Sequence, residues 1–266
     1  VAAIERAIEL NGTAVKFNLE AFRLGRLFAV NPEKVASLSP QRAAPLAQTN
    51  EAIVERQTRH LTNYQGQELA NRYRRKIEEF MTLEASLGLD DDVLSRTVAT
   101  NYARVLSYKD EYEVARLLSA ADLDESLRKT FEPGARLEYN LAPPFLGGKL
   151  VAGRPAKRAF SVRFMRPVLK VLARLKFLRG TFFDPFARTD ERRSERALIE
   201  HYEELLDVVS ASLSAQNYGH AVKLLGHVAK VRGYGPVKEE AIAIYRGEIA
   251  ALVEAFQTFS PVLRAA

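Results

Sequence analysis

The sequence predicts a mainly α-helical protein. Apolar residues recur at steps of three to five residues along most of the 266-residue chain, as they do on the buried face of a helix. Glycine, asparagine and proline separate these periodic segments at positions where helices end or begin. Apolar and polar residues alternate in two short runs, 137–141 and 160–164, which we expect to pair. The predicted fold is a multi-helix domain with one long helix and at most a small β-ribbon near 137–164.

The first 50 residues are predicted to precede the main domain. Residues 1–30 show a helix, a break at Asn11-Gly12 and a second helix. Residues 31–50 start with Asn31-Pro32, which is expected to end the helical unit, and their weak periodicity indicates a surface connection. Residues 51–266 are then the main helical domain. The helical pattern at the very start of the chain suggests a fragment of a longer protein.

The main domain is predicted to begin with a long helix over 51–87, with a kink or break near Gly66. Residues 93–118 are predicted to form one helix or two in line, and a short helix is expected over 123–130. The residues of 93–118 expected to face inward are Val98, Tyr102, Val105 and Leu106.

Residues 137–193 are distinguished by their charge. Between Glu138 and Asp184 there is no carboxylate but there are ten lysines and arginines, more than the net charge of +6 of the whole chain. Pro143-Pro144 and Gly147-Gly148 in this stretch indicate irregular loops.

An amphipathic helix is predicted within the basic stretch over 167–178, with Pro167 in its first turn. Its two expected faces are an apolar one with Val168, Val171, Leu175 and Leu178, and a basic one with Arg166, Lys170 and Arg174. Three further helices are predicted over 190–212, 215–231 and 237–256, the last two joined by a glycine turn with a proline at the first helical position.

Composition excludes several kinds of site from this chain. With no cysteine, it offers no disulfide, no thiolate for zinc or an iron–sulfur cluster, and no cysteine nucleophile. The four histidines show no close ligand spacing, and no standard catalytic motif is present. No apolar run approaches the roughly 20 residues that a membrane span needs, so we expect a cytoplasmic protein.

The first candidate site is a corner around Gly180. A glycine turn there brings guanidinium groups and a hydroxyl together, which suits either a phosphate or carboxylate ligand or a structural salt-bridge network. The residues are Arg179, Gly180, Thr181, Asp184, Arg188, Arg192 and Arg193. We favour the structural interpretation, in which Asp184 pairs with at least one of these arginines and Phe182, Phe183 and Phe186 anchor the corner in the core.

The second candidate site is the turn that contains Gly233, Gly235 and Lys238. A helix N-terminus there exposes backbone N–H groups beside a lysine, which suits an anion. The alternative, which we favour, is a close helix–helix turn that needs glycine for steric reasons.

The basic helix leaves three interpretations open: nucleic-acid binding, binding to an anionic membrane surface, and contact with an acidic neighbouring domain or partner. No helix-turn-helix signature is present, and tryptophan is absent.

Five stretches resemble the C-terminal region of one enzyme family. They are IELNGTAVKFNLEAFRLGRL (8–27), YKDEYEVARL (108–117), YNLAPPFL (139–146), LARLKFLRGTFFDPFARTDERRSERALIEHYE (172–203) and VRGYGPVKEEAI (231–242). In this order they resemble the bacterial indolepyruvate ferredoxin oxidoreductases, which are fused 2-oxoacid:ferredoxin oxidoreductases. Residues 1–30 resemble the end of the family's gamma-type catalytic domain, and the remainder resembles its terminal domain of undefined role.

The resemblance implies an activity for the parent polypeptide. Such an enzyme oxidatively decarboxylates an aryl pyruvate on thiamine diphosphate with Mg²⁺, passes electrons through iron–sulfur clusters to ferredoxin, and forms an acyl-CoA. The diphosphate-binding G-D-G…N element has no counterpart here, so we expect these cofactors upstream and no cofactor, metal or catalytic residue in this segment. The implied partners are the upstream catalytic domains, a second subunit in a homodimer, ferredoxin and CoA, without nucleic acid or membrane. The alternative is an independent basic helical module that binds nucleic acid or an anionic membrane.

Overall fold

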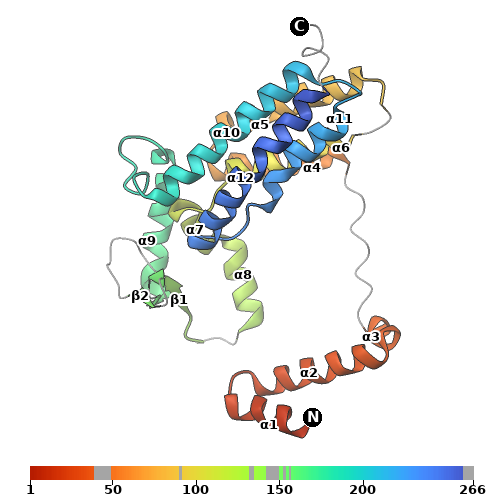
Figure 1. Ribbon diagram of the computed structural model, residues 1–266. Coiled ribbons are helices and arrows are strands. Elements are labelled where there is room, and N and C mark those ends of the chain that lie inside the picture. Colours follow the sequence, from red (N-terminus) through yellow and green to blue (C-terminus); the bar gives the residue numbers. More distant parts are fainter. Residues whose placement is uncertain are drawn as a thin grey trace. The chain divides into compact units, whose positions relative to one another are not determined.

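The structure, a computed structural model, describes residues 1–38, 49–89, 92–131, 135–141, 150–151, 154–155 and 157–259. Twelve α-helices and two short strand pairs lie within these ranges, which confirms the mainly α prediction (Figure 1). The chain divides into two compact units, residues 1–48 and residues 49–266. Pro143-Pro144 and Gly147-Gly148 lie outside the described residues.

The first unit contains α1 (Ala2–Asn11), α2 (Val15–Val30) and α3 (Pro32–Leu38). Gly12 ends α1 with a φ of 69°, a left-handed angle that glycine adopts without a Cβ clash. The third helix corrects the prediction that Asn31-Pro32 ends the helical unit. Asn31 Oδ1 instead accepts a hydrogen bond of 2.9 Å from the Lys34 N–H, and Pro32 takes the first helical position.

The predicted helix over 51–87 is divided, at the expected break, into α4 (Asn50–Tyr64) and α5 (Gln67–Ser86). The expected break occurs at Gly66, whose φ of 150° is open to glycine but strained for other residues. The chain reverses there, and the two helices pack against each other. One amphipathic stripe along 51–87 cannot tell a straight helix from two helices that pack on the same neighbours.

The next helices are α6 (Val93–Leu106), α7 (Glu111–Leu118) and α8 (Ala121–Thr130). The predicted inward residues Val98, Tyr102, Val105 and Leu106 are all buried. The start of α6 is capped from α5, because the buried carboxylate of Glu84 accepts hydrogen bonds from the N–H groups of Leu94 at 2.8 Å and Ser95 at 3.1 Å. A negative charge at this end of the helix also interacts favourably with the helix dipole.

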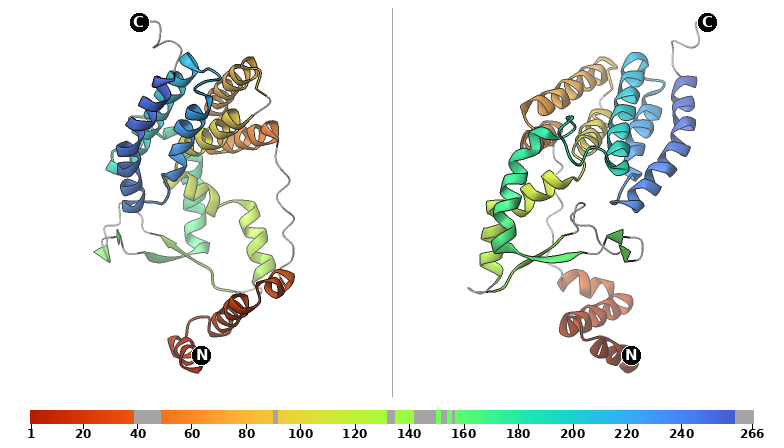
Figure 2. Two further views of the ribbon diagram at one scale, coloured as in Figure 1. Left: turned by 45° about the vertical axis from the view of Figure 1, so that its right-hand side comes forward. Right: turned by 90° about the vertical axis from the view of Figure 1, so that its left-hand side faces the viewer.

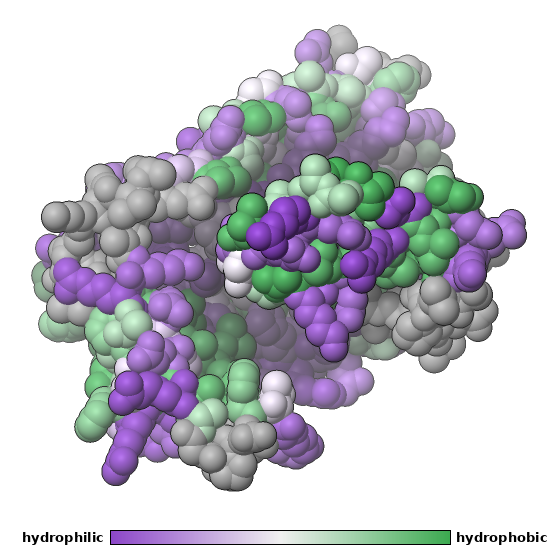
Figure 3. Space-filling view, turned by 90° about the horizontal axis from the view of Figure 1, so that it is seen from below, coloured by the Kyte–Doolittle hydropathy of each residue, from purple (hydrophilic) through white to green (hydrophobic). Residues whose placement is uncertain are grey.

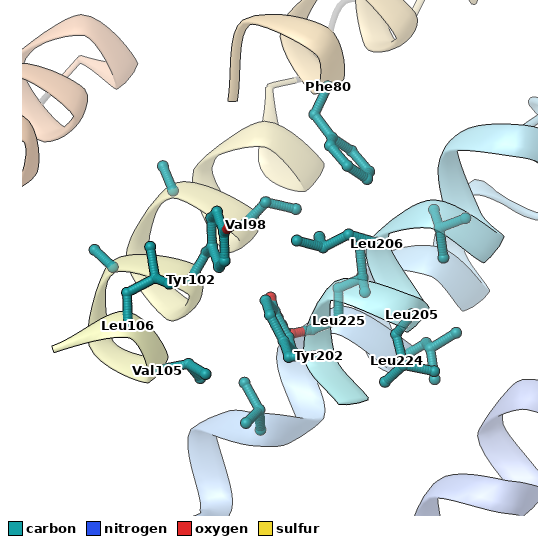
Figure 4. Packing of buried hydrophobic residues seen from close by; sticks show 14 of the residues in the cluster. Phe80, Val98, Tyr102, Val105, Leu106, Tyr202, Leu205, Leu206, Leu224 and Leu225 are labelled. Atoms are coloured by element: carbon teal, nitrogen blue, oxygen red, sulfur yellow. Dashed lines mark hydrogen bonds between the residues drawn. The ribbon is translucent and has the colours of Figure 1, made fainter. Parts of the chain in front are cut away.

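The main core lies between α4–α6 and the later helices α10 (Asp190–Ser212), α11 (Tyr218–Gly226) and α12 (Pro236–Thr258). A short 3₁₀ helix, η3 (His227–Lys230), joins α11 to the turn before α12. In Figures 1 and 2 the cyan and blue later helices lie alongside the orange and yellow helices, and Figure 4 shows their side chains meeting. The predicted helices over 190–212, 215–231 and 237–256 correspond to these elements.

Buried tyrosines connect the helices of this core. Tyr102 stacks on Tyr73 and on Tyr202, with ring centroids 6.0 and 6.1 Å apart. The hydroxyl of Tyr73 donates to the carbonyl of Ala99 and that of Tyr202 to the carbonyl of Leu225, each at 3.0 Å. These bonds satisfy hydroxyl groups that would otherwise be buried at a cost of about 1–3 kcal/mol each.

The predicted β-ribbon is present as β1 (Glu138–Leu141) paired antiparallel with β4 (Arg158–Ser161). A second, two-residue pair joins β2 (Leu150–Val151) to β3 (Arg154–Pro155). The ribbon ends earlier than its sequence pattern suggests, since Val162 and Phe164 belong to α9 (Val162–Arg174).

The basic amphipathic helix exists but starts five residues before its predicted start. Pro167 therefore lies inside α9 rather than in its first turn, and the 3₁₀ helix η2 (Leu175–Leu178) follows. Within the part of the chain that the structure describes, no helix combines the length and the apolar content required to cross a membrane.

Candidate functional site

The predicted corner follows η2, and its backbone turns at Gly180, which has a φ of 74°. This left-handed conformation suits glycine and reverses the chain toward α10. The hydroxyl of Thr181 bonds within the turn, where it donates to the carbonyl of Leu178 at 2.7 Å. The corner is therefore shaped by backbone geometry before any charge is considered.

The guanidinium of Arg179 is the centre of a buried polar cluster. Its side chain is only 6% exposed, and its Cζ lies 3.7 Å from the centroid of the Tyr64 ring. It donates to both carboxylate oxygens of Asp110, with 3.0 Å between Nη2 and Oδ1, and Nη1 donates to the Tyr64 carbonyl at 2.9 Å and to Gln65 Oε1. A planar, forked guanidinium suits this combination of ring stacking and a bidentate pair.

Asp110 has a second role in the same cluster. Its side chain is 3% exposed, and Oδ1 also accepts a hydrogen bond of 2.8 Å from the N–H of Glu113, which caps α7. Burial by itself disfavours the charged Arg179, but its hydrogen bond with Asp110 and the attraction of that carboxylate raise the pKa of Arg179 above its ordinary value. The pair joins the corner to the start of α7.

Asp184 forms no ion pair with the predicted arginines, so that prediction was wrong. Its buried carboxylate accepts hydrogen bonds from the N–H of Gly180 at 2.8 Å, the N–H of Phe186 at 3.0 Å and the hydroxyl of Tyr112 at 3.0 Å. The tight turn presents the two backbone donors next to the carboxylate, and Tyr112 of α7 supplies the third donor. Asp184 thus stabilises the corner through hydrogen bonds from backbone N–H groups of the same turn.

The remaining predicted arginines have other partners. Arg192 lies 3.4 Å from Glu111, Arg193 pairs with Asp190 at the surface, and Arg188 lies over the exposed ring of Phe182. The corner therefore brings together Arg179, Gly180 and Asp184 but leaves Arg188 and Arg193 outside the cluster.

The aromatic anchor of the corner is one residue rather than three. Phe186 is buried and packs edge-on against Tyr112 at 5.3 Å, whereas Phe182 is 81% exposed and Phe183 is 75% exposed. Only Phe186 points into the protein, because the turn directs Phe182 and Phe183, which precede Asp184, outward. The prediction was wrong for Phe182 and Phe183.

Three residues of the corner were not predicted from the sequence: Asp110, Tyr64 and Tyr112. One local signal for Asp110 was present, since Asp110 followed by Glu113 is a pattern typical of helix N-termini. No local signal connects it to Arg179, which lies 69 residues further along the chain.

The second predicted site, the glycine turn before α12, is a sterically constrained turn. Gly233 has a φ of 102°, and a Cβ placed there would lie 2.8 Å from Val237 Cγ1. Gly235 has a φ of 57° and precedes Pro236 at the first helical position. The ammonium group of Lys238 is paired, since its Nζ donates to Oε2 of the buried Glu195 at 2.5 Å.

The outer side of α9 is exposed and includes part of the predicted apolar face. Leu169 is buried and packs in a cluster with Met165, Leu172 and residues of α7. Val168 and Val171, which belong to the predicted apolar face, are each 58% exposed. The long N-terminal extension of α9 provides a different apolar stripe, and packing against α7 selects that stripe for burial.

This exposed side carries two stripes, which we call the α9 face. One stripe is apolar and comprises Phe164, Val168 and Val171; the other is basic and comprises Arg163, Lys170 and Arg174. Phe177 of η2, with 63% exposure, extends the apolar stripe. Large exposed apolar groups of this kind are typical of interaction surfaces.

Residues 50–251 match a family described as "Family of unknown function (DUF6537)". The chain belongs to this family. Neither the search of curated proteins nor the search of solved structures found a match. The matched range contains the corner, the α9 face and the glycine turn, so all three are features of the DUF6537 region.

No group of three or more metal-ligating side chains gathers in the described ranges of this DUF6537 protein. Its buried carboxylates are used by the fold: Asp110 binds Arg179, Glu195 binds Lys238, and Asp184 binds backbone donors. The corner is accordingly a structural cluster, and the α9 face presents exposed apolar and basic side chains.

Proposed function

We propose that this chain is a non-catalytic structural and interaction domain of a thiamine diphosphate-dependent indolepyruvate (2-oxoacid):ferredoxin oxidoreductase. The parent enzyme decarboxylates aryl pyruvates oxidatively, forms an acyl-CoA and reduces ferredoxin. The five resembling stretches support the identity of the parent enzyme. Thiamine diphosphate, Mg²⁺ and iron–sulfur clusters belong in this proposal to upstream parts of the polypeptide, and ferredoxin, CoA and a second subunit are partners of the whole enzyme.

The observation that carries the interaction role is the exposed α9 face. Burying the apolar stripe against another protein surface stabilises the contact by roughly 25 cal/mol for each Å² removed from water. The adjacent Arg163, Lys170 and Arg174 favour a neighbour with carboxylates around its apolar contact. We assign this neighbour to the catalytic domains of the same polypeptide.

The first unit supports the same proposal. None of residues 1–35 is buried, although Leu10 is 72% exposed, Phe17 71% and Val30 86%. Figure 3 shows hydrophobic residues between hydrophilic ones at the molecular surface. Helices with so little buried apolar surface are marginal in water, so we propose that α1–α3 complete the preceding gamma-type domain.

The gene provides the first test. The reading frame upstream of Val1 should encode cysteine clusters and a thiamine diphosphate motif, and a start codon directly before Val1 would contradict the proposal. The purified chain should also neither bind thiamine diphosphate nor reduce a viologen dye with indolepyruvate. Dye reduction by the isolated chain would place catalysis in this segment.

The α9 face is tested by the double substitution Val168→Ser and Val171→Ser. In the isolated chain it should change stability by less than about 1 kcal/mol, because both side chains are exposed. In the full-length enzyme it should lower the melting temperature and the indolepyruvate-dependent dye reduction. The matched control is Ile244→Ser on α12, since Ile244 is also β-branched, helical and 54% exposed. Equal behaviour of the two variants in the full-length enzyme would refute the docking role.

The second candidate function is binding to an anionic membrane or to nucleic acid. The adjacent apolar and basic stripes of α9 are the observation that favours a membrane surface. On our main proposal, association of the chain with acidic phospholipid vesicles or with DNA is weak and disappears at about 150 mM salt. Sub-micromolar binding at that salt concentration would favour the second function.

A further inference from the structure

A pocket of about 380 Å³ lies in the main domain, and no residue of the α9 face lines it. The C-terminal part of α6, the segment 107–109, η3 and the glycine turn before α12 surround it. Small-molecule sites commonly occupy about 300–1,000 Å³. The pocket is therefore large enough for an organic ligand, and its lining determines which kind.

The lining is strongly basic. Arg104, Lys109, Arg232 and Lys238 contribute to the pocket, and no carboxylate does. Lys238 is neutralised by Glu195 behind it, but the other three form no ion pair with any residue that the structure describes. Burial and the nearby charge of Arg232 lower the pKa of Arg104 below its ordinary value. A bound anion would relieve their repulsion.

The two guanidinium groups are anchored by the same short helix. Arg104 donates from Nη2 to the Val228 carbonyl at 2.7 Å, and Arg232 donates from Nε to the Ala229 carbonyl at 3.0 Å. A guanidinium has five N–H donors, so several remain for a ligand on each residue. Anchored arginines lose little conformational entropy on binding and match the geometry of phosphate oxygens.

An aromatic ring lies beside these charges. Tyr234 lines the pocket and is 65% exposed, and the Lys109 Nζ lies 4.3 Å from its ring centroid. Gly233 and Gly235 adopt the positive φ angles that shape the turn carrying Tyr234, and glycine tolerates such angles without strain. An exposed ring next to cations offers a stacking surface for a planar group attached to a phosphate.

We propose that this pocket binds a phosphorylated small molecule with a planar group, of the nucleoside diphosphate type. Arg104, Lys109 and Arg232 bind the phosphates, and the ring of Tyr234 stacks on the planar group. This inference goes beyond the proposed function and does not depend on it, because it uses only residues of the pocket.

The experiment is calorimetric titration of the whole 266-residue chain with ADP and, separately, with inorganic phosphate at about 150 mM salt. ADP should bind more tightly than phosphate. Arg232→Gln should weaken the binding of ADP at least tenfold. Tyr234→Leu should weaken the binding of ADP but leave the affinity for phosphate unchanged. Arg246→Gln, an exposed arginine of α12 outside the pocket, is the control and should not change either affinity.

Each result decides one part of the proposal. Arg232 is exposed, so its substitution should leave the melting temperature unchanged, and the loss of binding is then local. Arg104→Gln, whose folding is verified by circular dichroism, should give the same loss as Arg232→Gln. No ADP binding at millimolar concentration, or equal weakening by Arg246→Gln, would overturn the site. Equal binding of ADP and phosphate would overturn the stacking on Tyr234.

Discussion

Replacing Arg179 with methionine removes the only cation that contacts the buried Asp110 among the described residues. The substitution keeps much of the side-chain length but leaves a carboxylate that is 3% exposed without its ion-pair partner. Removing one member of a buried ion pair costs about 3–5 kcal/mol. For a unit that extends from Thr49 to Ala266, each kcal/mol corresponds to about 2–4 °C, so the melting temperature should fall by roughly 6–20 °C.

The double variant Arg179→Met with Asp110→Asn separates electrostatics from packing. Asparagine retains the oxygen that caps α7 through the Glu113 N–H but carries no charge. The double variant should therefore regain part of the stability lost in Arg179→Met. Differential scanning calorimetry measures all four proteins of this cycle. If the double variant is no more stable than Arg179→Met, the loss comes from packing on Tyr64, and the reasoning about the buried charge is wrong.

The other predictions concern the corner and the pH dependence of stability. Asp184→Ala leaves the buried donors of Phe186 and Tyr112 unsatisfied and should cost about 2–6 kcal/mol in chemical denaturation, whereas the 87%-exposed Asp190→Ala should cost under about 1 kcal/mol. The loss of stability in Asp184→Asn should lie between those of Asp184→Ala and Asp190→Ala. Equal denaturation midpoints for the three variants would exclude the hydrogen-bonded corner. Burial lowers the pKa of His60 below its ordinary 6.5, so the unfolded chain takes up the proton first and stability decreases as the pH falls through about 6.5. His60→Gln should reduce the dependence of the melting temperature on pH between about pH 7.5 and about pH 5. An unchanged slope of melting temperature against pH would contradict this.

Sequence alone was sufficient for the fold class and for most helix boundaries, because the signals that set them are local. Gly12 and Gly66 adopt positive φ angles that glycine tolerates best, and Pro236 starts α12 where a missing N–H has no cost. These effects act within a few residues. The alternating apolar runs 137–141 and 160–164 also overlap the antiparallel partners β1 and β4, although the second run continues into α9.

Tertiary structure decided which surfaces are buried and which charges meet. The apolar residues of α9 can face inward in two ways, and packing on α7 chose the stripe with Leu169 over the one with Val168. Arg179 selected Asp110 rather than the nearby Asp184, since the turn satisfied Asp184 with backbone donors. A sequence pattern specifies which side chains share a helix face, but the competition between faces and between partners is settled by segments that are distant in the chain.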